Sequence, residues 1–285
     1  MEFITKLRNI KHRAFSNRKF LYEQYLPFRD SINSIHHPRL IALHRQLRAR
    51  LEEQKRNWEN GYCDGYFYQG YEKIGISGVK PTEQRLKNYS IYDLLSKDQS
   101  ILDIGSNCGF LAVHVASFVK QVDAIEINPY LNKIGEDTAY FLGTKNVNFI
   151  TADFSSFTTQ KKYDAVFSLS NHHTIDGNLN MGFLRYSEKI FNLLKPGGLL
   201  FFESHNVWGD GNLGPGDDSD LDKKLELSGQ YFEIVKHKMV HSFYPVDIDK
   251  LFVVFRRRLI QDPTFKTNFD LVSARTSYEY TETTS

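Results

Sequence analysis

The chain has few of the residues that mark specialised structural classes. Its 285 residues include only two cysteines, Cys63 and Cys108, so a disulfide framework is excluded and reduced cysteines are the simplest interpretation. No apolar run is long enough to span a bilayer, and the first twenty residues alternate apolar and basic side chains without a signal-peptide core. We therefore expect a cytoplasmic protein with no membrane span.

The remaining composition is sufficient for a globular core. Hydrophobic residues make up 41% of the chain and charged residues 25%, which excludes a disordered protein. This length fits one α/β domain of ordinary size with an extension.

The net charge of +2 hides an asymmetry along the chain. Residues 1–56 hold thirteen Lys and Arg against five Asp and Glu, which leaves 23 against 29 for the remainder. A basic segment of this kind can meet an anionic partner. The alternative is a solvated helical face whose Arg and Lys stems pack on the domain. Leucines 40, 43, 47 and 51 predict one long docking helix over Arg39–Asn57.

The segment Ser100–Phe110 carries the strongest chemical signal. Ile101–Ile104 is typical of a short buried strand, and Gly105 and Gly109 then allow a tight turn that opens a helix. Asp103 stands where a pyrophosphate would approach in a dinucleotide site and would repel it. A carboxylate at this position favours a cationic ligand.

This segment resembles the first motif, D-x-G-x-G-x-G, of class I S-adenosylmethionine-dependent methyltransferases, with Asn107 in place of the middle glycine. Asparagine tolerates left-handed backbone geometry better than most residues. The resemblance implies S-adenosylmethionine as cofactor and an α/β fold, a Rossmann-like doubly wound seven-stranded sheet, mostly parallel, with a C-terminal antiparallel strand pair and an N-terminal helical extension. The implied cofactor residues of this turn are Asp103, Gly105, Ser106, Asn107, Gly109 and Phe110.

Further strand patterns follow in the order of that family. A second strand over Asp123–Asn128 places Glu126, followed by Ile127, at the offset of a ribose-binding carboxylate. By the resemblance, Asp153 and Phe154 after the third strand lie at the adenine. That third strand is predicted over 146–152 and the fourth over 163–168. The fifth, 199–203, follows the turn Leu194–Gly198, and an antiparallel pair is predicted over 231–240 and 250–256. The predicted helices are 110–119, 131–141 and 181–194.

The resemblance covers residues 97–258. We expect a basic helical arm with an aromatic cap over residues 1–90, the methyltransferase domain over 91–260 and a tail over 261–285.

The segment Trp58–Arg85 is rich in Tyr, Phe and Gly and resembles the cap that many methyltransferases fold over the cofactor. Its Pro81–Arg85 stretch, P-T-E-x-R, resembles one found in a subset of bacterial members. Thr82 is predicted to cap a helix there. Arg85 is a candidate for the cofactor carboxylate, and Tyr71 is a candidate lid residue beside the methionine part.

Histidines follow the fourth and fifth strands, at the edge where open α/β sheets bind ligands. His172, His173 and His205 are candidate bases for removing a hydroxyl proton, although such histidines also serve to hydrogen-bond the backbone. The neighbouring candidates are Ser170 for the cofactor and Asn171, Glu203 and Trp208 for the substrate. A metal held by Glu203, His205, Asp210, Asp217 or Asp218 is an alternative, but their spacing matches no metal pattern and we expect none.

These patterns predict O-methylation of a hydroxyl on a sugar, glycan or polar small molecule. The motif N-P-P-Y, with which many enzymes hold an amino group, is replaced by Ser168–Asn171. RNA or terminal-phosphate methylation through the basic arm is the first alternative. An inactive cofactor-binding subunit is the second.

Overall fold

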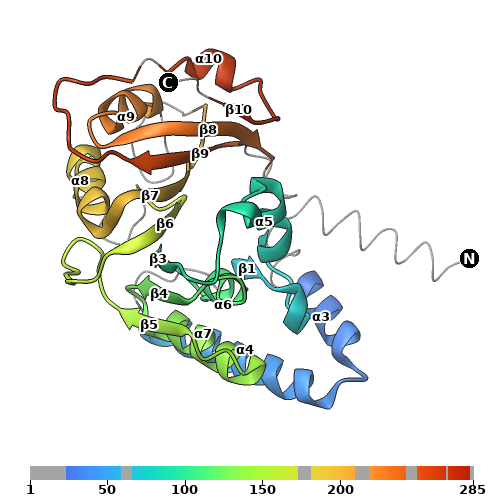
Figure 1. The fold of residues 1–285 in the computed structure, drawn as a ribbon. Helices are drawn as coiled ribbons and strands as arrows, with labels where there is room; N and C mark the ends of the chain where they lie inside the picture. Colours follow the sequence, from blue (N-terminus) through green and yellow to red (C-terminus); the bar gives the residue numbers. More distant parts are fainter. Residues whose placement is uncertain are drawn as a thin grey trace, which may run out of the picture.

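The computed structural model describes residues 24–58, 66–172, 181–208, 219–241, 249–267 and 269–282. One eight-stranded sheet, in the order β10-β8-β9-β7-β6-β3-β4-β5, runs through the molecule (Figure 1). Its strands are β3 (Ser100–Ile104), β4 (Gln121–Glu126), β5 (Val147–Thr151), β6 (Tyr163–Leu169), β7 (Leu194–Glu203), β8 (Phe232–Val240), β9 (Lys250–Arg257) and β10 (Thr281–Glu282).

The strands from β7 to β5 pair in parallel, whereas β9 and β8 are antiparallel. This confirms the predicted seven-stranded sheet with a C-terminal antiparallel pair. The two-residue β10 adds a further strand at the β8 edge. Parallel strands are covered on both faces, so their residues are apolar almost throughout.

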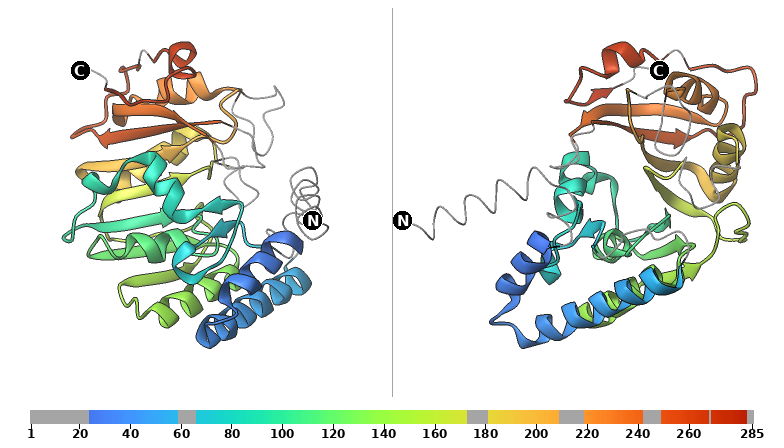
Figure 2. Two further views of the ribbon diagram at one scale, coloured as in Figure 1. Left: turned by 90° about the vertical axis from the view of Figure 1, so that its right-hand side faces the viewer. Right: turned by 180° about the vertical axis from the view of Figure 1, so that it is seen from behind.

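Helices cover both faces of the sheet (Figures 1 and 2). One apolar cluster packs α8 (Phe183–Leu193) and α9 (Leu221–Ser228) on the sheet, and a second packs α5 (Thr82–Tyr89) and α6 (Phe110–Val115) on the opposite face. The remaining helices are α7 (Pro129–Leu142), the short α10 (Leu271–Ala274), and α3 (Leu26–Ser34) and α4 (Pro38–Asn57) of the extension.

The predicted long helix of the extension is confirmed as α4, which lies along α7 (Figure 2). Its side chains Leu43, Leu47 and Leu51 are buried in a cluster with Leu131 and Ile134 of α7. The apolar stripe of the extension therefore docks on the chain's own α/β domain.

Residues 66–81, here called the lid segment, connect the extension to α5. They contain the parallel pair β1 (Gln69–Gly70) and β2 (Lys80–Pro81), with the short helix η2 (Glu72–Ile74) between them. A second short helix, η3 (Tyr92–Leu94), leads from α5 to β3.

Two local predictions are wrong. The helix α5 has Pro81 at its N-cap position, and the hydroxyl of Thr82, at the first helical position, has no hydrogen-bond partner among the described residues. The expected turn Leu194–Gly198 lies within β7, where the pairing with β6 shifts from Tyr163 opposite Leu194 to Ala165 opposite Leu199. A bulge accommodates the extra residues.

In the described part of the chain, no helix has both the length and the apolar character needed to cross a membrane.

Candidate functional site

The turn after β3 has left-handed backbone at three positions. The φ angles are 65° at Gly105, 55° at Asn107 and 70° at Gly109. Asn107 thus adopts the conformation that the sequence predicted for this departure from the glycine motif. Left-handed geometry is unfavourable for most L-residues, so a side chain other than Asn would be strained here.

Neighbouring side chains leave no room at the glycines of this turn. A Cβ atom at Gly105 would lie 2.5 Å from Oδ1 of Asn171, and one at Gly109 would lie 2.5 Å from the ring of Phe149. The side chain of Asn171 donates a hydrogen bond to the carbonyl of Ile104. The turn is therefore packed closely against the end of β6 and against β5.

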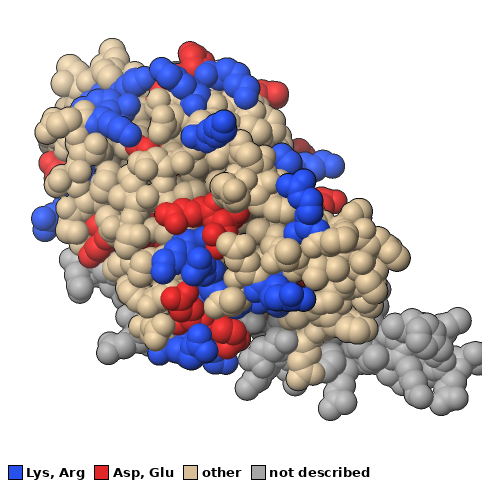
Figure 3. Space-filling model, turned by 90° about the horizontal axis from the view of Figure 1, so that it is seen from below, with Lys and Arg blue, Asp and Glu red and all other residues tan. Residues whose placement is uncertain are grey.

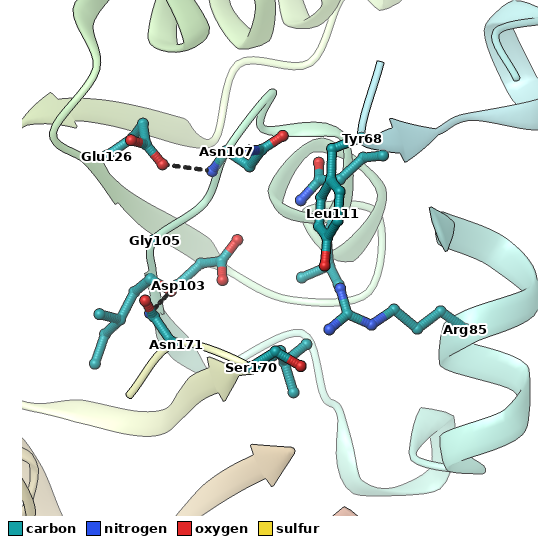
Figure 4. A pocket seen from close by; sticks show the side chains of 12 residues that line it. Tyr68, Arg85, Asp103, Gly105, Asn107, Leu111, Glu126, Ser170 and Asn171 are labelled. Carbon is teal, nitrogen blue, oxygen red and sulfur yellow. Dashed lines mark hydrogen bonds between the residues drawn. The ribbon is translucent and has the colours of Figure 1, made fainter. Parts of the chain in front are cut away.

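A cavity of about 490 Å³ opens beside this turn (Figure 4). It is lined by Tyr68, Gln69, Arg85, Asp103, Ile104, Gly105, Asn107, Leu111, Glu126, Leu169, Ser170 and Asn171. A second cavity of about 230 Å³ shares Ile104, Gly105, Glu126 and Asn171 with it. The two lie side by side at the carboxyl ends of β3, β4 and β6.

Asp103 points into the larger cavity (Figure 4) with only 4% of its surface exposed. Its Oδ2 has no hydrogen-bond partner among the residues that the structure describes. Burial raises the pKa of this carboxyl to about 7, although Arg85 acts to lower it. A buried carboxylate in this state fits a cationic group that supplies the missing partner.

Glu126 also lines the cavity, and two backbone N–H groups fix its carboxylate. Its Oε2 accepts the backbone N–H of Asn107 at 2.9 Å, and its Oε1 accepts that of Asn128 at 3.0 Å. Because a carboxylate has about four acceptor sites, it can also accept hydrogen bonds from ligand hydroxyls.

The second cavity is lined by apolar side chains beside Glu126 and Asn171. Ile127 and Phe154 line it together with Ile125 and Ala152. Asp153 does not line it and instead accepts hydrogen bonds from the backbone and hydroxyl of Ser155.

A buried charged cluster borders the larger cavity. Glu203 Oε1 lies 2.8 Å from Nη2 of Arg85 and 3.4 Å from Nζ of Lys80, and the other oxygen accepts the hydroxyl of Tyr89. Burial acts to raise the pKa of Glu203, but Arg85 and Lys80, together with Lys250, hold it well below its ordinary value. Burial lowers the pKa of Lys80 well below its usual range.

The histidine candidates differ in their surroundings. Burial, together with the charge of Lys250, holds the pKa of His205 well below its ordinary value, and its ring hydrogen-bonds to the backbone of His172. The ring of His172 lies edge-on to Phe183 at 4.9 Å and near Tyr186 at 5.2 Å. His173 lies outside the described residues.

Other predicted residues lie away from the cavities. Tyr71 and Phe110 are buried against each other, with ring centroids 5.8 Å apart, and line neither cavity. Ser106 is buried in the turn. Trp208 is 57% exposed, and the guanidinium of Arg275 covers its ring at 4.9 Å.

Sequence reasoning missed Tyr68, Gln69, Leu111 and Leu169 as cavity residues. For Tyr68 and Gln69, the only signal was the high aromatic content of the segment Trp58–Arg85, which led to the choice of Tyr71 instead.

The metal alternative has no support in the described part of the chain, which contains no group of three or more His, Cys, Asp or Glu that could hold an ion. Asp210, Asp217 and Asp218 lie outside the described residues.

Two basic residues of the extension are paired with acids, and two others contact uncharged side chains, Arg29 the hydroxyl of Ser77 and Arg39 the ring of Phe141. Arg48 contacts Asp30 at 3.4 Å, and Arg50 contacts Asp137 at 3.1 Å. The face of α4 and α7 seen from below carries Lys and Arg beside Asp and Glu (Figure 3). This arrangement favours the solvated helical face.

Comparisons with known proteins agree with this geometry. A family model described as "Methyltransferase domain" matches residues 101–198. Malonyl-[acyl-carrier protein] O-methyltransferase 2 of Ilyobacter polytropus is 29% identical over 108 residues, which are 37% of this chain and 39% of that protein. An uncharacterized protein of Methanocaldococcus jannaschii is 28% identical over 96 residues, 34% of this chain and 33% of that protein. The matches thus span less than two fifths of the length of either relative.

Among solved structures, the [4+2]-cyclase SpnF has a TM-score of 0.50 and 19% identity, covering 64% of this chain and 86% of that chain. The N-methyltransferase NodS from Bradyrhizobium japonicum has a TM-score of 0.48 and 17% identity, covering 61% and 96%. At these identities the likeness to SpnF is one of fold.

Proposed function

Residues 101–198 are a class I S-adenosylmethionine-dependent methyltransferase domain, and from that premise we propose that the protein methylates a hydroxyl oxygen of a sugar, a glycan or another polar small molecule. The observation that carries the cofactor part of the proposal is the unsatisfied Oδ2 of Asp103, which faces the cavity between the glycine turn and Glu126. Two relatives whose names describe O-methyltransferases support oxygen as the acceptor atom.

The residues around the cavities match the parts of the cofactor in order. Asp103 would accept the ammonium group, Glu126 the ribose hydroxyls, and the guanidinium of Arg85 would donate to the carboxylate. Ile127 and Phe154 would pack on the adenine. Asp153 lines neither cavity, so its place near the adenine amino group rests on the family resemblance alone. When bound, S-adenosylmethionine supplies a methyl group on a positively charged sulfur.

The acceptor proton requires a base close to the reacting oxygen. His205 is held neutral by burial, and one ring nitrogen is engaged by the backbone of His172. The other ring nitrogen is then the basic atom. His205 is our principal candidate, with His172 and His173 as alternatives, because burial keeps its ring neutral and the backbone contact fixes its orientation. The protein's remaining task is to align donor and acceptor.

Calorimetry with S-adenosylhomocysteine tests the cofactor assignment. We expect the wild type to bind and Asp103→Ala and Glu126→Ala to lose binding. If the wild type does not bind, the proposal is contradicted. A subunit that catalyses no methyl transfer is then the favoured interpretation.

A screen of acceptors with isotopically labelled methyl groups then tests the reaction. With a confirmed acceptor, His205→Gln should lower kcat about 10²-fold to 10⁴-fold. His36→Gln, at an exposed histidine of the extension, is the matched control and should leave kcat unchanged. Label on nitrogen or carbon would show that the oxygen assignment is wrong.

The RNA alternative makes a different prediction. An arm that grips phosphates loses RNA affinity steeply as salt rises. Removal of residues 1–23, which leaves α4 intact, should abolish such binding. This alternative would be excluded if the protein had no RNA affinity, or if neither higher salt nor the truncation changed that affinity.

A further inference from the structure

Gln69 of the lid segment bridges the two ends of the cofactor turn. Its Nε2 donates to the backbone carbonyl of Ser106 at 3.0 Å, and its Oε1 accepts the backbone N–H of Phe110 at 2.9 Å. The residue is 5% exposed and lines the larger cavity. One amide side chain thus joins the start of the turn to the first residue of α6.

The turn depends on side chains for these contacts. A helix leaves its first backbone N–H groups without partners, and that of Phe110 is buried here. Glu126 holds the middle of the turn through the N–H of Asn107. Gln69 and Glu126 together therefore fix a backbone that has left-handed geometry at three positions.

Close backbone contacts within the lid segment fix the position of Gln69. A Cβ atom at Gly78 would lie 2.3 Å from the carbonyl carbon of Gln69, and one at Gly70 would lie 2.7 Å from the nitrogen of Gly78. The backbone of β1 and that of Gly78, two residues before β2, therefore approach as closely as glycine allows. A displacement at this contact between Gly78 and β1 would move the amide of Gln69 that supports the turn.

We propose that Gln69 is a positioning residue for the cofactor, through which the lid segment sets the shape of the turn that binds it. This inference rests on the proposed function, because the turn is taken to be the cofactor site. Gln69 acts on the ligand through Ser106 and Phe110.

The test compares Gln69→Met with Gln69→Glu by calorimetry with S-adenosylhomocysteine. Met retains the length of the side chain and loses both hydrogen bonds, so affinity should fall about tenfold at every pH. Ionised Glu still accepts from Phe110 but places a second oxygen against the carbonyl of Ser106. Protonated Glu can donate to that carbonyl as Gln does.

The affinity ratio of Gln69→Glu to wild type should therefore recover by at least threefold between pH 8 and pH 6, whereas the ratio for Gln69→Met should stay constant. Gln46→Glu, at an exposed position of α4, controls for charge. The midpoint of thermal unfolding without ligand, measured at both pH values, controls for folding. Wild-type affinity in Gln69→Met, or a ratio for Gln69→Glu that does not change with pH, would overturn the inference. Failure of the wild type to bind would instead overturn the proposed function.

Discussion

Nη2 of Arg85 lies 2.8 Å from Oε1 of Glu203 inside the protein. The pair joins the helix that follows the lid segment to the carboxyl end of β7, 118 residues later in the chain. Both side chains are almost fully buried, so neither charge is solvated and each depends on the other.

Replacement of Glu203 by Gln should therefore be strongly destabilising. Arg85 and Lys80 would remain buried without their carboxylate, and breaking such a pair costs about 3 to 5 kcal/mol. Urea denaturation at neutral pH measures the change in unfolding free energy. Glu233→Gln, which breaks a more exposed pair with Arg258, is the matched control and should cost less than about 1 kcal/mol. Equal effects would contradict the prediction.

Asp103→Asn should stabilise the ligand-free protein at alkaline pH. The folded-state pKa of Asp103 is raised to about 7 by burial, so the folded protein retains a proton that the unfolded chain has lost. Its unfolding free energy then falls as pH rises from about 4 to about 7. The substitution removes this dependence and should add up to about 4 kcal/mol at pH 8. An equal slope in both proteins over this range would contradict the assignment.

The same carboxyl should make cofactor affinity depend on pH. The ionised form pairs with the ligand ammonium, so the affinity of the wild type for S-adenosylhomocysteine should fall as pH drops below about 7, by at most about tenfold per pH unit. Calorimetry from pH 5.5 to 8.5 measures the slope. Over the same pH range, the weaker affinity of Asp103→Asn for S-adenosylhomocysteine should not change with pH.

At position 107, backbone geometry should decide which substitutions are tolerated. Asn107 has a φ angle of 55°, so Asn107→Gly should fold with similar stability. Asn107→Val should cost about 2 kcal/mol and weaken cofactor binding, because a β-branched residue is strained there. Thermal unfolding and calorimetry on the two variants distinguish this from a requirement for the amide, which would harm both equally.

Gly78→Ala should damage the lid segment. The new Cβ would lie 2.3 Å from the backbone carbonyl carbon of Gln69, so the backbone at position 78 must move away from β1, which should cost about 1 to 3 kcal/mol. A Cβ at Gly182 meets nothing within 4 Å, so Gly182→Ala should cost less than about 1 kcal/mol. Chemical denaturation compares the two.

The order of strands could be predicted because each buried strand is an apolar run that ends in a recognisable turn. Asp103 and Glu126 could be assigned from the same local pattern. Their placement around one cavity follows from the topology, since adjacent parallel strands end at one edge of the sheet.

The remaining site residues depend on contacts distant in the chain. Gln69 reaches the turn from 37 residues away, and no periodicity identifies it among the aromatic residues around it. Tyr71 was the expected lid residue, yet in the folded protein it is buried against Phe110. The pairing of Glu203 with Arg85 joins segments that only the folded sheet brings together.

The packing of α4 on α7 means that the helical extension and the α/β sheet share one apolar cluster. Leu47 and Leu51 are as inaccessible as the residues of the central strands, and α7 in turn packs on β4 and β5. A chain beginning at residue 91 would leave that side of α7 open to water. Leu131 and Ile134, which now pack against the leucines of α4, would then be exposed to solvent.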